Sequence, residues 1–146
     1  MPHSGRPSIY EIPLGAPDSG PYDITTGPDG ALWLTMVHTG QLSRMTLDGH
    51  LDHYPLDPTS CGPSIIIPGS DATLWFTRIH DHRIGRISTA GDTMSFRVPT
   101  PSSGPFGIVT GPDDALWFTQ MPNHTASHSA LTATSTLHWR SGQSHA

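Results

Sequence analysis

The sequence has a single cysteine, Cys61, and no lysine, so its seven Lys and Arg residues are all arginine. One cysteine excludes a framework of disulfides within the chain. The formal net charge of −5 makes nucleic acid or an anionic membrane an unsuitable partner, and we expect neither. No stretch is long and apolar enough to cross a bilayer, and residues 1–8 lack the apolar segment of a signal peptide. We therefore expect a flexible N-terminus at 1–8 and a cytoplasmic protein.

Helix-forming stretches are also scarce, whereas residues that interrupt regular structure are abundant. The chain has 15 Gly and 15 Pro among 146 residues, and 34% of its residues are hydrophobic. Short runs of alternating apolar and polar residues lie between the Gly and Pro positions, a pattern typical of strands joined by turns. The composition therefore predicts an all-β protein with many short strands.

A sequence repeat of 42 residues organises these runs. Leu-Trp pairs begin at Leu32, Leu74 and Leu116, and Gly-Pro pairs begin in the same phase at Gly20, Gly62 and Gly104. A period of about 40 to 45 residues with four strands per unit is typical of a propeller blade. In the first unit we expect strands at 22–26, 31–36, 41–47 and 51–56. Gly-Pro-Asp-Gly at 27–30 and Asp-Gly at 48–49 should form the turns.

The repeat predicts a partial β-propeller over residues 9–120. We expect a closing strand at 9–14, complete blades at 15–56 and 57–98, and half a blade at 99–120, which is about two and a half four-stranded blades. One tryptophan per unit should fill the space between neighbouring sheets, because a lone sheet of this size has too little to pack against. Open blade edges would favour self-association.

Residues 121–146 depart from the repeat. They contain a low-complexity run of Ser, Thr, Ala and His, which predicts a disordered tail. A change of reading frame in the gene would explain the departure. Codons for residues 124–127 can encode His-Arg-Ile in another frame, and His82-Arg83-Ile84 stands one repeat earlier.

The repeat resembles that of a known family. The segment 103–119 reads Ser-Gly-Pro-Phe-Gly-Ile-Val-Thr-Gly-Pro-Asp-Asp-Ala-Leu-Trp-Phe-Thr, and Arg83-Ile-Gly-Arg-Ile87 follows the preceding copy. These units are similar to the repeat of the virginiamycin B lyase, or streptogramin B lyase, family over about residues 9–120. The resemblance implies a ring of seven blades, of which this chain holds the N-terminal portion. It also implies that Ile9–Leu14 is the first strand of the family's chain, a strand that commonly completes the last blade.

The resemblance implies a lyase that linearises a cyclic depsipeptide antibiotic and thereby gives resistance. In the family, magnesium polarises carbonyl groups of the lactone and a His removes the proton alpha to a carbonyl, so that the ester carboxylate leaves. The His follows Gly-Pro in late blades, but here those positions hold Tyr22, Ser64 and Phe106. We therefore assign no catalytic or metal-binding residue, and we expect a truncated, inactive N-terminal fragment that binds no magnesium specifically.

Tyr22 is the one residue that the resemblance assigns to the substrate. The family also has Tyr at this position of its first blade, facing the central cleft, and a phenol suits an aromatic-rich cyclic peptide. The alternative is that Tyr22 only lines the top of the blade. A second function, from a different class, is a non-enzymatic propeller-repeat module that binds a partner or assembles with itself.

Three further groups of residues favour structural roles. His80-Asp81-His82 and the equivalent His38 lie where a surface loop is expected, and this ligand set is weak for a metal. Arg44 and Arg86 occupy equivalent positions, where their stems can cover the sheet while their guanidinium groups bond to backbone carbonyls. Cys61 stands where the other repeats have Ser, which favours a packed or lightly exposed thiol.

Overall fold

The computed structural model describes residues 7–15, 17–112, 114–121 and 136–139. These residues form short strands and one 3-10 turn, η1 (Thr59–Cys61). The strands are β1 (Pro21–Thr26), β2 (Leu32–Met36), β3 (Gln41–Met45), β4 (Leu51–Pro55), β5 (Pro63–Pro68), β6 (Leu74–Arg78), β7 (Arg83–Ile87), β8 (Thr93–Arg97), β9 (Pro105–Thr110), β10 (Leu116–Gln120) and β11 (Thr136–Trp139). No helix in the described ranges is long and apolar enough to cross a membrane.

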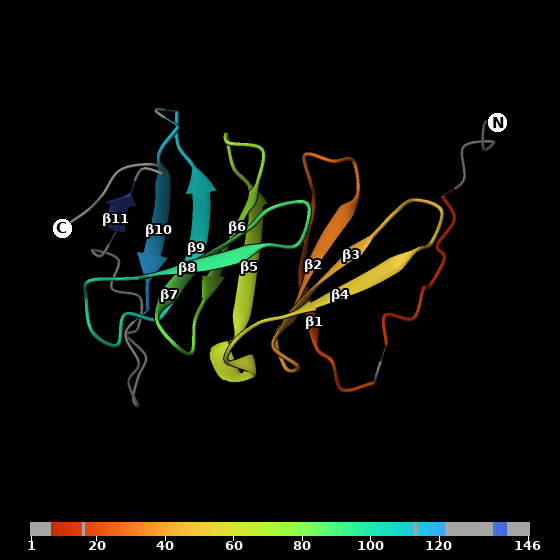
Figure 1. Ribbon diagram of the computed structural model, residues 1–146, viewed down its shortest axis with the longest axis horizontal. Coiled ribbons are helices and arrows are strands. Elements are labelled where there is room, and N and C mark those ends of the chain that lie inside the picture. Colours follow the sequence, from red (N-terminus) through yellow and green to blue (C-terminus); the bar gives the residue numbers. More distant parts are fainter. Residues whose placement is uncertain (1–6, 16, 113, 122–135, 140–146) are drawn as a thin grey trace.

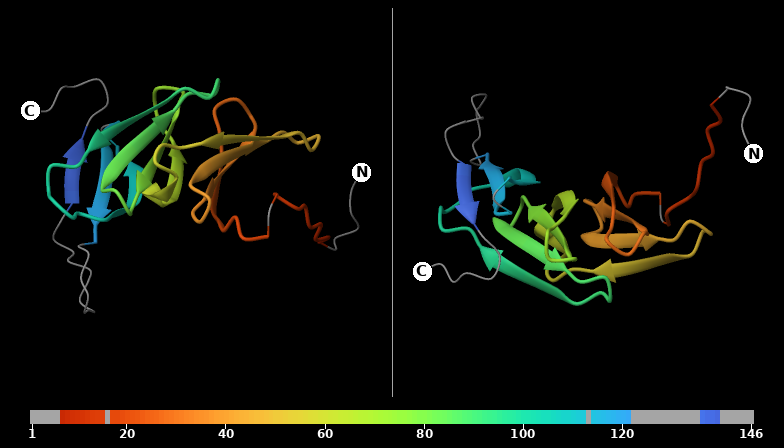
Figure 2. Two further views of the ribbon diagram at one scale, coloured as in Figure 1. Left: turned by 60° about the horizontal axis from the view of Figure 1, so that its bottom comes forward. Right: turned by 90° about the horizontal axis from the view of Figure 1, so that it is seen from above.

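In the described ranges, three antiparallel sheets stand side by side (Figure 1). The first has the order β1-β2-β3-β4, the second β5-β6-β7-β8, and the third β11-β10-β9. Strand β5 contacts β1 on one side and β9 on the other, so these three strands form the inner side of the array. Figure 2 shows β4 and β8 along the opposite, outer side. The all-β, partial-propeller prediction is confirmed.

The strands form where the repeat predicts them, because the turn sequences end each run. In the first unit the Gly27 amide donates to the Ala31 carbonyl at 2.8 Å, and Gly30 adopts φ 81°, a region that favours glycine. The second unit repeats the first contact between Gly69 and Thr73 at 2.8 Å. The four strands of one unit therefore pair in sequence order.

Two apolar clusters fill the spaces between neighbouring sheets. The cluster between the first and second sheets includes Trp33, Leu42, Leu56, Cys61, Ile66, Leu74, Phe76 and Ile87. The cluster between the second and third sheets includes Trp75, Ile84, Val98, Ile108, Leu116 and Phe118. Trp33 and Trp75 are 0% and 2% exposed, so the predicted packing of one tryptophan between sheets is confirmed at both junctions.

The structure differs from the sequence-based prediction at both ends. The segment 9–14, predicted as a closing strand, forms no strand, and Ile9, Tyr10 and Ile12 are 89%, 81% and 55% exposed. A closing strand needs the open edge of another sheet. The three-stranded sheet β11-β10-β9 lies at the opposite end of the molecule from this segment (Figure 1). The tail predicted as disordered over 121–146 contains β11, which pairs with β10 from Leu116↔Trp139 to Thr119↔Thr136. The remainder of that tail, and residues 1–6, lie outside the described residues.

Candidate functional site

The inner strands bring together the three residues that follow the Gly-Pro pairs. Each pair begins with glycine at positive φ, 69° at Gly20, 68° at Gly62 and 54° at Gly104. The register of β1 then shifts between Pro21 and Ile24, and that of β5 shifts between Pro63 and Ile66. Such bulges re-aim side chains and are frequent beside functional sites. The repeat thus presents Tyr22, Ser64 and Phe106 at one end of the inner strands.

Tyr22 and Phe106 contact each other although they belong to the first and third sheets. Their ring centroids are 6.2 Å apart at an interplanar angle of 65°, an edge-to-face arrangement. Ser64, on the sheet between them, is 2% exposed, and its hydroxyl donates to the Gly62 carbonyl at 2.9 Å. Tyr22 remains 54% exposed. The site therefore offers an aromatic surface with an accessible tyrosine, and no carboxylate or imidazole stands at these three positions.

A threonine hydroxyl connects each bulge to the next sheet. The Thr35 hydroxyl accepts the Asp23 amide at 3.0 Å and donates to the Ser64 carbonyl at 2.7 Å. The Thr77 hydroxyl accepts the Ile65 amide at 3.1 Å and donates to the Phe106 carbonyl at 2.9 Å. Each threonine thereby satisfies an amide that the bulge removes from the strand ladder and holds the residue after Gly-Pro in the following sheet. These two threonines did not stand out in the sequence, although each occupies the next-to-last position of a Leu-Trp strand.

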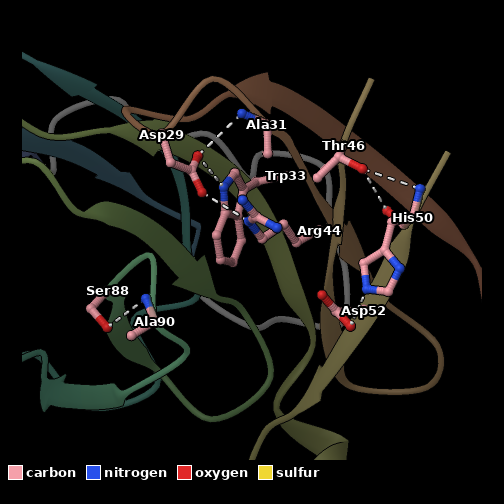
Figure 3. Close-up of polar contacts among 9 residues, drawn as sticks. All are labelled: Asp29, Ala31, Trp33, Arg44, Thr46, His50, Asp52, Ser88 and Ala90. Atoms are coloured by element: carbon pink, nitrogen blue, oxygen red, sulfur yellow. Dashed lines mark hydrogen bonds and ion pairs between the residues drawn. The ribbon is translucent and has the colours of Figure 1, made fainter. Parts of the chain in front are cut away.

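Each of the first two sheets also carries an aspartate bonded to tryptophan and arginine. Asp29 accepts the Trp33 indole N–H at 3.1 Å and the Arg44 Nε–H at 2.8 Å (Figure 3). The Arg44 guanidinium carbon lies 5.9 Å from the centroid of the Trp33 ring, and Tyr54 stacks on that ring at 5.6 Å. This cluster fastens the turn at Asp29 to the indole and the third strand.

The second sheet repeats the cluster with only small changes. Asp71 accepts the Trp75 indole N–H at 3.3 Å and the Arg86 Nε–H at 3.2 Å. Phe96 stacks on Trp75 at 5.9 Å. The structural role predicted for Arg44 and Arg86 is confirmed, but the predicted backbone-carbonyl partner is wrong. A carboxylate lies in reach, and it binds the guanidinium more strongly than a neutral carbonyl does.

The two aspartates are ionised more readily than free aspartate. Burial opposes ionisation, but hydrogen bonds from Arg44 and Trp33 outweigh it and lower the pKa of Asp29. Burial likewise opposes ionisation of Asp71, where hydrogen bonds from Thr73, Trp75 and Arg86 lower the pKa. A carboxylate that stays ionised and saturated with donors is a structural anchor and does not serve as a general base at neutral pH.

The histidines that could have formed a metal site lie against different parts of the chain. His80 lies against Gly62, where an added Cβ would stand 2.5 Å from its Nδ1, and His38 has the same relation to Gly20. Asp81 binds Arg78 at 2.6 Å. The His82 Nδ1 accepts the Gly104 amide at 3.0 Å. In the described part of the chain no three His, Cys, Asp or Glu residues are grouped so that they could hold a metal ion.

Cys61 is fully buried between the first and second sheets. Burial raises the pKa of its thiol to about 11, so the thiolate form is scarce at neutral pH. The predicted packed thiol is confirmed.

The similarity of the chain to known proteins indicates its family. The model of the virginiamycin B lyase family matches residues 7–137. The virginiamycin B lyase of Staphylococcus aureus is 38% identical, with a TM-score of 0.72 over 89% of this chain. A second solved streptogramin B lyase is 32% identical, with a TM-score of 0.74 over 92% of this chain. A gluconolactonase-like protein at 13% identity and a TM-score of 0.63 shares the fold alone.

The matched relatives are longer than this chain. It covers 44% of the S. aureus lyase and 45% of the second solved lyase. The virginiamycin B lyase of Mycolicibacterium smegmatis is 50% identical over 41 residues, which are 28% of this chain and 14% of that protein. A catalytically inactive variant of the S. aureus lyase, 37% identical to this chain, has been crystallised with quinupristin. With the family model matching most of its residues, the chain belongs to the virginiamycin B lyase family.

Proposed function

We propose that this chain supplies the N-terminal blades of a streptogramin B lyase. The complete ring would linearise a cyclic depsipeptide antibiotic at its lactone ester and so give resistance. The observation that carries this proposal is the 38% identity with the S. aureus lyase over 89% of the chain, together with its TM-score of 0.72. Relatives under 25% identity share only the fold, so they do not bear on the substrate.

The reaction proposed for the complete ring is an elimination. A base removes the proton alpha to a carbonyl, the C–H electrons form a carbon–carbon double bond, and the ester C–O bond breaks to release the carboxylate. Magnesium, when bound, would lower the energy of the charge that develops on the carbonyl oxygens. The residues described in this chain do not fit such an ion, because Tyr22, Ser64 and Phe106 occupy the positions that would face it. We therefore assign no step of the reaction to a residue of this chain.

The contribution that we propose for this chain is substrate contact through Tyr22. Its ring is 54% exposed and is supported from the side by Phe106 at 6.2 Å. A rigid ring with a hydroxyl group gives a large contact area at a small entropic cost, which suits a cyclic peptide with aromatic side chains. Quinupristin is the ligand named with the S. aureus lyase, and a streptogramin B is therefore the compound to test.

We propose further that the chain by itself is inactive, since none of the three inner positions carries a base. Purified chain would be incubated with magnesium and quinupristin, and the products would be analysed by liquid chromatography and mass spectrometry. The S. aureus lyase serves as the positive control. We expect intact cyclic antibiotic with this chain and linear product with the control. Linear product with this chain, abolished in a Tyr22→Phe or Tyr22→Ala variant, would contradict the inactivity.

A second candidate function is a non-enzymatic module that binds a partner or assembles with itself. The exposed face of β1, where Ile24 is 54% exposed, favours it. Size-exclusion chromatography tests the assembly, because a defined oligomer favours it whereas a heterogeneous aggregate opposes it. The expected cytoplasmic location stays a prediction, which fractionation of cells that express the chain would check.

A further inference from the structure

The exposed segment 9–14 has the repeat position of a fourth strand. It stands one repeat before 51–56, which contains β4, and two repeats before 93–98, which contains β8. Tyr54 on β4 stacks on Trp33, and Phe96 on β8 stacks on Trp75. The corresponding residue of the segment is Ile12, and it is 55% exposed. The segment therefore has the sequence position of a fourth strand but pairs with no described sheet.

The third sheet, as described, lacks a fourth strand. Its order is β11-β10-β9, whereas each of the other two sheets has four strands. Among the described residues, no strand pairs with the outer edge of β11. Pro13 does not oppose pairing there, because Pro55 occupies the same repeat position in β4, at the edge of its sheet. The chain thus contains both a three-stranded sheet and the strand type that would complete it.

The open face of the first sheet and the open face of the third sheet are also complementary. The face of β5 packs against the first sheet, so that Ile66 is 1% exposed, but the equivalent Ile24 on β1 is 54% exposed. The Thr35 hydroxyl donates to the carbonyl of Ser64 in the next sheet, at 2.7 Å. Tyr22 carries the corresponding carbonyl on β1, and Thr119 carries the corresponding hydroxyl on β10. The two open faces therefore present the two halves of a contact that the chain already makes twice.

The two complementary ends cannot meet within one copy. Figure 1 shows the N-terminal segment and the first sheet at one end of the molecule and β9–β11 at the other. We propose that two copies of this chain associate head to tail. Segment 9–14 of each copy pairs with β11 of the other, and the face of β1 packs on the third sheet of the other copy. The contact uses the same repeat positions as the contact between the first and second sheets.

The number of sheets in a propeller sets the stoichiometry. The described residues of each copy form three sheets, and a head-to-tail contact forms either a closed ring or an open filament. Propellers have about four to eight blades, and six is the multiple of three in that range. A dimer therefore closes both contacts at once. This proposal concerns assembly and does not rest on the lyase reaction.

Light scattering after size-exclusion chromatography tests the stoichiometry. We expect a species of twice the chain mass of 15.7 kDa that dissociates to a monomer on dilution. A monomer at every concentration, or aggregates without a fixed mass, would overturn the proposal.

The Ile24→Asp variant tests the face that is used. Ile24 is exposed in the monomer, so the variant should keep the tryptophan fluorescence and near-ultraviolet circular dichroism of the folded chain, and we expect at least tenfold weaker dimerisation. Met94→Asp is the matched control, because Met94 is 50% exposed on β8 of the second sheet, which takes no part in the proposed contact. Unchanged dimerisation of Ile24→Asp, or an equal loss in Met94→Asp, would overturn the assignment.

Hydrogen exchange tests the strand without any substitution. The amides of 9–14, apart from Pro13, should exchange at least tenfold more slowly at a concentration where the dimer forms than after dilution. Equal exchange rates at both concentrations would show that 9–14 is not paired in the dimer, and the proposed strand exchange would be wrong.

Discussion

Ile24, Ile66 and Ile108 occupy the same position of three successive repeats, yet they differ in burial. Ile66 and Ile108 are 1% and 7% exposed, whereas Ile24 is 54% exposed. All three lie on the first strand of their sheets, after a Gly-Pro pair. The difference arises because, in the part of the chain that the structure describes, a preceding sheet covers β5 and β9 but none covers β1. In this fold the neighbouring sheet, and not the local sequence, decides whether a repeat position belongs to the core.

This comparison separates two kinds of stabilisation. Contacts within a sheet, such as the bonds of Asp29 and Asp71 to tryptophan and arginine, are present in both the first and second sheets. Contacts between sheets depend on having a neighbour. Repeat proteins in general divide their stability between the unit and the interface in this way. Substitutions at equivalent positions should therefore have equal effects within sheets and unequal effects between them.

The largest expected effect is at the isoleucines. Ile66→Ala should lower the free energy of unfolding by about 2–5 kcal/mol, because it leaves a cavity between two sheets. Ile24→Ala should change it by less than about 0.5 kcal/mol, because the side chain is exposed in the monomer. Urea denaturation at a concentration where the chain is monomeric measures both. Equal losses in the two variants would contradict the role of the neighbouring sheet.

A glycine substitution should act equally in both sheets. An added Cβ at Gly27 or Gly69 would stand 2.5 Å from the Cδ1 of Trp33 or Trp75. Displacing the indole should make Gly27→Ala and Gly69→Ala each cost about 1–3 kcal/mol of stability. Thermal unfolding followed by tryptophan fluorescence provides the measurement. A large effect at Gly69 with none at Gly27 would show that this contact depends on the neighbouring sheet after all.

Removing a threonine hydroxyl should cost more stability between two sheets than on the open third sheet. Thr77→Val removes a hydroxyl that bonds to the Ile65 amide and to the Phe106 carbonyl, and we expect a loss of about 1–2 kcal/mol. At Thr119 the described contact is to the Gly107 amide alone, at 3.0 Å and in an exposed setting. Thr119→Val should therefore cost roughly half as much or less. Chemical denaturation of the monomer measures both losses of unfolding free energy, and a larger loss in Thr119→Val than in Thr77→Val would contradict the prediction.

The smallest expected effect is the loss of stability at acid pH. The pKa values of Asp29 and Asp71 are lowered in the folded chain, so their stabilisation is fully present above the pKa of the unfolded chain, about 3.9. It is lost as the pH falls through the folded pKa. Both carboxylates are partly exposed, 18% and 26%, which limits the effect. Urea midpoints measured from pH 6 down to pH 2.5 should fall less steeply in Asp71→Asn than in the unsubstituted chain, and identical slopes would exclude this contribution.

Much of the fold could be predicted because the same pattern of strands and turns recurs in the sequence, with its Gly-Pro and Leu-Trp pairs present three times. The strands expected at 22–26 and 41–47 are found at Pro21–Thr26 and Gln41–Met45, since turn sequences bound them. The exposed segment 9–14 was predicted as a strand because its sequence matches β4. It forms no strand because none of the described sheets pairs with it, and local sequence does not encode that.

The candidate site was predictable in its positions but not in its contacts. The Gly-Pro pairs located Tyr22 and Phe106, but their contact depends on how three sheets are arranged around the inner strands. The partners of Arg44 and Arg86 could have been found, because Asp29 and Asp71 precede them by the same number of residues in each repeat. β11 could not, since its sequence departs from the repeat and its pairing with β10 is a long-range contact.

Native-state hydrogen exchange at Ile24 and Ile66, in dilute monomeric protein, tests the central claim most directly. The Ile66 amide donates to the Asp23 carboxylate of the first sheet at 2.9 Å and lies in the core between two sheets. We expect it to exchange only through global unfolding, while the Ile24 amide exchanges at least tenfold faster through local opening of β1. Equal protection of the two amides would contradict the claim that a neighbouring sheet, rather than the repeat itself, defines the core.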